Sequence, residues 1–310
     1  MARDIIAVTW GGLGDVLMCT PAFHAIKEAH PDRRVIVYCL REDHRNVLLQ
    51  NPNIDSLRVL LPKYMWRYSR HLYAYLFNSE GLKYYDSKRF KFYYLFFQHV
   101  PSVLYEQKHV MDILPEIFGD LAIDVSRKKC ELYFTPNEEE KARSAVAPYK
   151  NIVFVHVHSK CSENHHWLPE RWNELVASLP QYTFIQVGGK NETPVRGAVD
   201  WRGRTGLREA FCLFKHGDAF VGVDSCFAHV ANAFNVPGVV LFGDSSPVFV
   251  GHNTNINIYK GLSCSPCEEY LNGHACPIGH SCMNIITVEE VRESLLRQLA
   301  VRKHAYVEKV

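Results

Sequence analysis

The stretch IIAVTWGGLGDVL at residues 5–17 decides the fold class, because it joins a buried strand to a helix through a glycine-rich turn. Residues 5–8 form a short, continuous apolar run, typical of parallel strands that are covered on both faces. Glycines then interrupt the run, and Asp15 opens a pattern of apolar residues with helical spacing that continues to Ala29. We therefore predict a strand, a tight turn and a helix, which begin a β-α-β unit.

The same alternation continues along the chain, stops after about 60 residues and restarts near residue 150. The predicted strands are 5–8, 35–38, 57–61, 152–155, 182–187, 219–223 and 239–242. The predicted helices are 15–29, 43–49, 169–179, 207–214, 226–234 and a terminal helix from 288 to about 302. We therefore predict an α/β protein with two Rossmann-like lobes, at 1–148 and 149–310. Ligands of such lobes bind in the loops after the strands, so these loops carry the candidate site residues.

Length and composition limit the classes of protein to which the chain can belong. Its 310 residues are too many for one small core, and 47% hydrophobic residues are enough to fill two. The 35 basic and 33 acidic residues nearly cancel, which argues against binding to a nucleic-acid backbone. The N-terminus lacks the long apolar region of a secretory signal, and no stretch approaches the roughly 20 apolar residues of a spanning helix. We expect a cytoplasmic protein with mostly reduced cysteines and at most peripheral contact with the inner face of the membrane.

Residues 62–110 interrupt the alternation with a high density of aromatic and basic side chains. The segment has no clean strand period and few turn signals, so we predict that it is mainly helical and forms a wall or flap of the first lobe. Two interpretations remain open. The aromatic residues pack within the lobe, or they form an acceptor-binding surface whose aromatic faces and cationic tips contact sugars and anionic groups.

The glycine-rich turn after the first strand is the first candidate site. Gly12 and Gly14 allow the backbone to approach a ligand closely, and the following helix directs its positive end toward the same place. The spacing differs from G-x-G-x-x-G, which weighs against a nicotinamide cofactor. Asp15 fits two roles, as the N-cap of the helix and as a carboxylate aimed into the cleft between the lobes.

Two strand-end loops of the second lobe form the other candidate site. Asp224, Ser225 and Cys226 follow a predicted strand and begin a helix, whose free backbone N–H groups would hold a diphosphate. His229 lies one helical turn further on the face of Ser225, and Gly243 follows the next strand. The alternative is an ordinary capped helix with a hydrogen-bonded histidine in the core. Two polar loops at strand ends in one lobe favour the anion site.

Four cysteines gather near the C-terminus with the spacing C-x2-C-x8-C-x5-C. They are Cys264, Cys267, Cys276 and Cys282. Four thiolates in a reduced protein suit a tetrahedral Zn²⁺ or iron site, although the second pair is more widely spaced than usual. The alternative is that the cysteines of this loop, residues 261–283, only pack, so the loop is a candidate for a structural metal site.

Several of these motifs together resemble glycosyltransferase family 9, whose best-known members are the lipopolysaccharide heptosyltransferases. The motifs are Gly-Asp-Val-Leu before Thr-Pro-Ala, Trp-x-Pro-Glu-Arg-Trp, Asp-Ser-x-x-x-His before Leu-Phe-Gly-x-x-Ser-Pro, and Cys-Pro-Ile-Gly-His-Ser-Cys-Met. They stand at 14–17 and 20–22, at 167–172, at 224–229 and 241–247, and at 276–283. The resemblance covers roughly residues 3–40 and 150–295 and leaves the middle of the chain unmatched.

The resemblance implies a GT-B architecture, in which two Rossmann-like lobes face each other across a cleft. It implies inverting transfer of a sugar, a heptose from ADP-heptose being favoured, to a hydroxyl of a surface glycan, lipopolysaccharide core or protein. It gives Asp15 the role of general base toward the acceptor and gives the second lobe the nucleotide-sugar donor. It also implies catalysis without a metal, although some relatives, the autotransporter heptosyltransferases, carry an iron-binding cysteine finger.

Two positions depart from the family pattern. Cys226 stands where glycine usually follows Asp-Ser, and its side chain narrows the approach to the phosphate. His165 and His166 stand where a lysine is frequent, so either Lys160 supplies the cation at the donor site or the leaving group is stabilised more weakly. We count all three basic residues among the donor-binding candidates. These departures keep open a different class of function, a catalytically silent nucleotide-sugar-binding or scaffold protein of the same fold.

Overall fold

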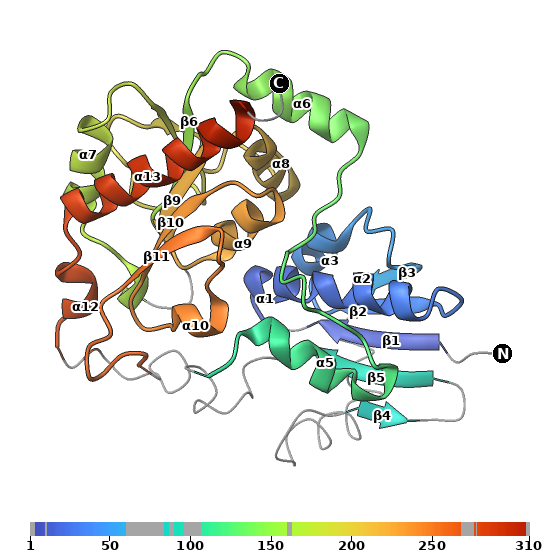
Figure 1. Ribbon diagram of the computed structural model, residues 1–310. Helices are drawn as coiled ribbons and strands as arrows, with labels where there is room; N and C mark the ends of the chain where they lie inside the picture. Colours follow the sequence, from blue (N-terminus) through green and yellow to red (C-terminus); the bar gives the residue numbers. More distant parts are fainter. Residues whose placement is uncertain are drawn as a thin grey trace. The chain divides into compact units, whose positions relative to one another are not determined.

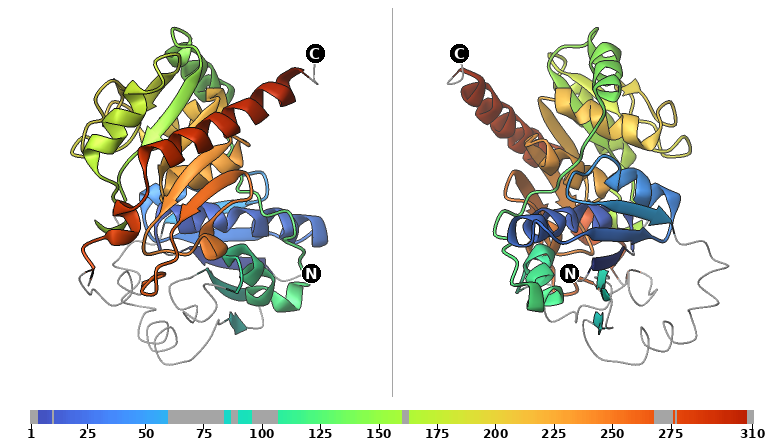
Figure 2. Two further views of the ribbon diagram at one scale, coloured as in Figure 1. Left: turned by 60° about the vertical axis from the view of Figure 1, so that its left-hand side comes forward. Right: turned by 90° about the vertical axis from the view of Figure 1, so that its right-hand side faces the viewer.

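Each half of the chain is built on its own β-sheet (Figures 1 and 2). The structure, a computed structural model, describes residues 4–9, 11–59, 84–86, 90–95, 107–159, 163–267, 276 and 278–307. The chain divides into two compact units, Met1–Tyr133 and Phe134–Val310. The boundary expected at residue 148 lies after helix α6 (Pro136–Val146), whereas the structure places this helix in the second unit.

The sheet of the first unit has the strand order β3-β2-β1-β5-β4. Its strands are β1 (Asp4–Thr9), β2 (Val35–Cys39), β3 (Ser56–Val59), β4 (Tyr84–Asp86) and β5 (Phe90–Leu95). Strands β3, β2, β1 and β5 are parallel, and β4 runs antiparallel beside β5. The prediction that 62–110 is mainly helical is wrong for the described part, because β4 and β5 lie within it. Strand β5 pairs along the whole of β1, and its run of phenylalanine and tyrosine favours a strand. The rest of that segment lies outside the described residues.

A break divides the helix that was expected at 15–29 into α1 (Leu13–Met18) and α2 (Thr20–Ala29). Pro21 causes the break, because it has no N–H to donate to the carbonyl of Leu17. The hydroxyl of Thr20 donates to that carbonyl at 2.7 Å and accepts the backbone N–H of Glu131 at 2.8 Å. The Thr20 side chain therefore gives the Leu17 carbonyl the hydrogen bond that Pro21 cannot donate. It also anchors the last residues of the first unit. The remaining helical segments are α3 (Glu42–Leu48), η3 (Val110–Ile113), α5 (Leu114–Ile117) and η4 (Gly119–Leu121).

The sheet of the second unit has the order β11-β10-β9-β6-β7-β8, and all six strands are parallel. The strands are β6 (Ile152–His156), β7 (Thr183–Gln186), β8 (Val199–Asp200), β9 (Ala219–Val223), β10 (Gly238–Phe242) and β11 (Asn255–Tyr259). Besides α6, the helices are η5 (Glu163–His165), α7 (Pro169–Ala177), α8 (Leu207–Leu213), η6 (Phe214–His216), α9 (Cys226–Ala233), α10 (Pro247–Val250), α12 (Ser281–Asn284) and α13 (Val288–Val307). The predicted α/β alternation is confirmed here, with β8 and β11 as additions.

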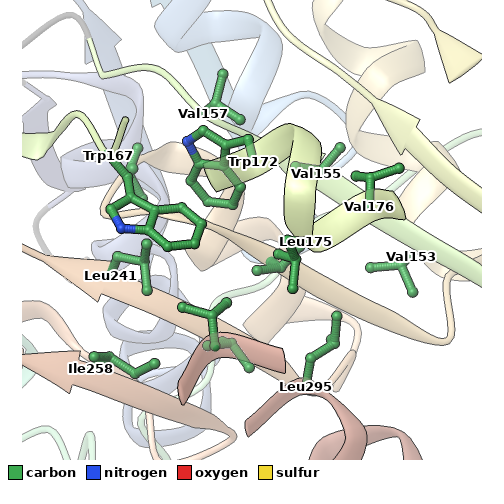
Figure 3. Packing of buried hydrophobic residues seen from close by; sticks show 14 of the residues in the cluster. Val153, Val155, Val157, Trp167, Trp172, Leu175, Val176, Leu241, Ile258 and Leu295 are labelled. Carbon is green, nitrogen blue, oxygen red and sulfur yellow. The ribbon is translucent and has the colours of Figure 1, made fainter. Parts of the chain in front are cut away.

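Two different cores cover the faces of this sheet. On one face, aliphatic strand residues pack against α7 and α13 beside Trp167 and Trp172, whose rings meet edge to face at 4.8 Å (Figure 3). The Trp167 indole donates to the carbonyl of Ile286 at 3.0 Å, which ties the start of α7 to the chain before α13. On the other face, phenylalanines of β6, η6 and α9 stack, with 4.5 Å between the rings of Phe154 and Phe214. Both cores fix the strands whose carboxyl ends carry the candidate site.

Helix α6 joins the second unit through its first turn. Thr135 and Glu138 form a capping box, and Glu138 also binds the guanidinium of Arg208 with contacts of 2.6 and 2.9 Å. The Arg208 hydrogen bond is the main cause that lowers the pKa of Glu138 to about 2. No helix in the described part of the chain is both long and apolar enough to cross a bilayer.

Candidate functional site

In the first unit, the turn after β1 holds the carboxylate of Asp15. Helix α1 begins at Leu13, so Gly12 is the N-cap and Asp15 is the third helical residue, which corrects the predicted N-cap role of Asp15. The carboxylate reaches back and accepts the N–H of Gly12 at 2.6 Å. Gly11 has a φ of 91°, and a Cβ there would overlap with the Asp15 carboxylate. The turn therefore fixes a half-buried carboxylate at the carboxyl end of the central strand. Gly14 lies inside α1.

In the second unit, Asp224 and Ser225 link the end of β9 to α9, and a histidine binds each of them. Ser225 is the N-cap residue of α9, but its hydroxyl does not cap the helix. The hydroxyl instead lies 2.9 Å from Nδ1 of His156. Nε2 of His156 lies 3.4 Å from the carboxylate of Glu192, which also accepts the N–H of Gly189 at 2.7 Å. Burial acts to raise the pKa of Glu192. Its hydrogen bond to His156 acts in the opposite direction, and the pKa of Glu192 is lowered on balance. An ionised carboxylate thus supports the histidine that holds Ser225.

The second histidine, His165, lies between two carboxylates. Its Nδ1 is 3.1 Å from the backbone oxygen of Asp224, and its Nε2 is 2.5 Å from the carboxylate of Asp244. The carboxylate of Asp224 accepts the hydroxyl of Ser245 at 2.6 Å and lies 3.9 Å from Nδ1 of His165. Burial acts to lower the pKa of His165, but Asp244 and then Asp224 outweigh it, so this pKa is raised. Of these residues, Asp244 and Ser245 were not predicted. Their position directly after β10 was the available signal.

His229 has surroundings that differ from those expected of an anion-binding residue. Its side chain is buried, and its Nδ1 lies 2.7 Å from Nε2 of His252. Burial lowers the pKa of His229 against the opposing effect of Asp224, so the ring is neutral near pH 7. This geometry favours the alternative of a hydrogen-bonded core histidine. Gly243 has a steric role, since a Cβ there would overlap with the carbonyl oxygen of Asn164.

The other donor-binding candidates lie around the same strand ends. Cys226 is the first residue of α9 and is half-buried. The His166 ring lies 4.7 Å from that of His158, and both line a cavity of about 390 Å³ over Trp167. Lys160 lies outside the described residues.

The four cysteines of the C-terminal loop lie near one another without converging on one point. Cys282 is buried, and the other three are half-buried. Burial raises the pKa of Cys282 to about 11, and the thiols of Cys267, Cys276 and Cys264 add to this effect. The described residues do not bring three of these sulfurs within 4.8 Å of one another. The donor set suits Zn²⁺ or iron in its chemistry, and a cation would relieve the electrostatic cost of ionising these thiols.

Comparisons with solved structures identify the architecture. Glycosyl transferase family 9 from Veillonella parvula DSM 2008 has a TM-score of 0.75 at 18% identity, covering 97% of this chain and 99% of that one. The E. coli ADP-heptose lps heptosyltransferase II has a TM-score of 0.64 at 15% identity, with coverage of 97% and 100%. The iron-containing dodecameric glycosyltransferase TibC from enterotoxigenic E. coli H10407 has a TM-score of 0.65 at 16% identity, with coverage of 96% and 76%. These similarities show a fold of the GT-B type.

The sequence itself identifies the family. A comparison with curated protein sequences finds no match. The profile of the family described as "Glycosyltransferase family 9 (heptosyltransferase)" matches residues 84–276, which are more than half of the 310 residues. The chain belongs to glycosyltransferase family 9.

Proposed function

We propose that the protein transfers a heptose from ADP-heptose to a hydroxyl group of a surface glycan, lipopolysaccharide core or protein, with inversion at the anomeric carbon. Membership of a glycosyltransferase family supports sugar transfer. The heptose and the ADP are supported by the solved structures of similar fold, among them E. coli heptosyltransferase WaaC with ADP. We also propose that the protein works in the cytoplasm, where nucleotide sugars are available.

The observation that carries the proposal is the fixed carboxylate of Asp15. As the acceptor hydroxyl attacks the anomeric carbon, it has to lose its proton, and a positioned carboxylate can accept it. The hydrogen bond from Gly12 holds one oxygen of Asp15 at 2.6 Å, so the carboxylate is oriented before the acceptor arrives. A protein that only binds nucleotide sugars has no use for this proton acceptor.

The second unit supplies the donor site in this proposal. The carboxylate of Asp224 suits hydroxyl groups of the sugar, because an ionised carboxylate only accepts hydrogen bonds. Helix α9 begins at Cys226, and the positive end of its dipole can stabilise the charge that develops on the departing diphosphate. The bond between sugar and diphosphate breaks as the new glycosidic bond forms, and ADP leaves with the electron pair.

The variant Asp15→Asn tests the proposal. Turnover of ADP-heptose should fall by two or more orders of magnitude, whereas ADP should bind with nearly unchanged affinity. Asp43→Asn is the matched control, because Asp43 also lies in the first turn of a helix of the first unit and accepts backbone and guanidinium hydrogen bonds. Near-normal turnover of Asp15→Asn would remove Asp15 from the role of base. A wild-type protein that binds ADP-heptose without transferring or hydrolysing it would favour the silent binding protein.

We also propose that the cysteine loop holds a structural Zn²⁺ or iron ion, with Cys264, Cys267, Cys276 and Cys282 as ligands. The thiol donor set supports this proposal, as does the proximity through which the other three thiols raise the pKa of Cys282. TibC, which has a similar fold, is iron-containing. Such an ion would fix the loop, and no step of sugar transfer needs it.

A further inference from the structure

The two ring nitrogens of His165 both face hydrogen-bond acceptors. Nδ1 lies 3.1 Å from the backbone oxygen of Asp224, and Nε2 lies 2.5 Å from a carboxylate oxygen of Asp244. A neutral imidazole carries only one N–H, so it can satisfy only one of these contacts. The imidazolium carries two, and it satisfies both. Beside an ionised Asp244, this geometry favours the imidazolium form of His165, because only that form donates to both acceptors.

This cation is sealed from water and joins three separate loops. The side chains of His165 and Asp244 are 5% and 1% exposed. His165 belongs to η5, Asp224 to the connection between β9 and α9, and Asp244 to the connection between β10 and α10. Asn164, the neighbour of His165, packs so closely on Gly243 that a side chain there would overlap with its carbonyl. The charged contact and the close backbone packing thus hold the same loops together.

We propose that Asp244 is a positioning residue of the donor site, which keeps His165 as a buried imidazolium and thereby fixes the loop that carries Asp224. The inference rests on the proposed function, because it takes this loop as part of the donor site, with Asp224 toward the sugar and the start of α9 toward the diphosphate of ADP. Asp244 itself is buried behind His165 and need not touch the donor.

The charges around His165 determine how the site responds to pH. Asp244 and Asp224 are the charged groups that act on the ring. Ser245 is uncharged, and its hydroxyl donates a hydrogen bond to the carboxylate of Asp224. Loss of the ring proton removes one of the two contacts and leaves two neighbouring carboxylates without a cation between them. Because the pKa of His165 is raised, the cation persists above the usual range of histidine and is lost only as the pH rises further. Donor affinity should therefore hold through neutral pH and fall in alkaline solution.

Calorimetric titration of the full-length protein with ADP, from pH 5.5 to pH 9, tests this role. The wild type should keep its affinity to above pH 7 and then lose it. In Asp244→Asn the ring loses its nearer carboxylate and keeps only Asp224, at 3.9 Å, so at pH 7.5 ADP should bind at least tenfold more weakly, and affinity should recover as the pH falls to 5.5. Asp218→Asn is the matched control, because Asp218 accepts the N–H of Ile152 at 2.8 Å elsewhere in this unit. It should leave the pH profile unchanged.

A measurement on the wild type alone tests the protonation state. The ¹⁵N shifts of the His165 ring, assigned with His165→Gln, should show both nitrogens protonated at pH 7. A neutral tautomer at pH 7, or an Asp244→Asn variant with the wild-type affinity and pH profile, would overturn the inference. A wild type that binds no ADP at any pH would overturn the proposed donor site instead, and the role of Asp244 with it.

Discussion

Gly243→Ala should destabilise the second unit and weaken donor binding together. The new Cβ would overlap with the carbonyl oxygen of Asn164, and it would lie 3.1 Å from the carbonyl carbon and 3.2 Å from the side chain of Met283. A flexible side chain could turn away, but a backbone carbonyl can move only with η5. Overpacking of this kind costs about 1–3 kcal/mol, and we expect the upper part, about 2–3 kcal/mol. For a unit of this size the melting temperature should fall by roughly 4–12 °C.

The same displacement should affect ADP, because η5 also carries His165. We expect an approximately tenfold increase of the dissociation constant, equivalent to about 1.4 kcal/mol. Differential scanning calorimetry and ADP titration of the same preparation measure both effects. Gly206→Ala is the matched control, since a Cβ at Gly206 meets nothing within 4 Å and only the helix cap changes. A Gly243→Ala protein that melts within about 1 °C of the wild type and binds ADP normally would refute the steric argument.

Three further predictions concern other parts of the chain. Asp224→Ala should weaken binding of ADP-heptose more than binding of ADP, as measured by calorimetry, and equal losses would contradict a contact between Asp224 and the sugar. Cys264→Ser combined with Cys267→Ser should abolish zinc or iron in elemental analysis of untagged protein, and metal retained by this double variant would exclude these ligands. Glu138→Gln should destabilise the second unit at pH 7, because it breaks the contact with Arg208. The pKa of Glu138 is lowered to about 2, so its contribution to the free energy of unfolding is present above about pH 4.5 and lost toward pH 2. The free energies of unfolding of variant and wild type, measured by urea denaturation, should therefore differ at pH 7 and converge near pH 2.

Local patterns in the sequence were enough to predict most of the fold. Strands such as β6 and β9 are continuous apolar runs between turn residues, and they are buried in the structure as this pattern requires. The errors arose where long-range contacts decide the conformation. Strand β5 is defined by its pairing along β1, which no local period reveals. The boundary between the two units also depends on a distant contact, because Arg208 binds α6 to the second unit.

The candidate site could be predicted in its location but only partly in its contacts. The loops after β1 and β9 were identified because parallel sheets bind ligands at the carboxyl ends of strands. The partners of the site residues could not be identified, because they come from segments distant in sequence. Asp244 is 79 positions from His165, and Glu192 is 36 from His156. The contact between His229 and His252 could not be predicted either, because the two residues are 23 positions apart and only the fold brings their rings together.

The hydrogen bond of the Thr20 hydroxyl shortens the segment that connects the two units. This hydroxyl binds the backbone of Glu131, and the capping box of α6 fixes Thr135, so only residues 132–134 lie between two anchored points. The chain passes once from one unit to the other, within this interval. Three residues span at most about 10 Å and have two rotatable backbone bonds each, about six in all. A rotation about this connection turns these few bonds, so Leu132→Pro, which keeps the side-chain contacts of Tyr133 and Phe134, would stiffen it.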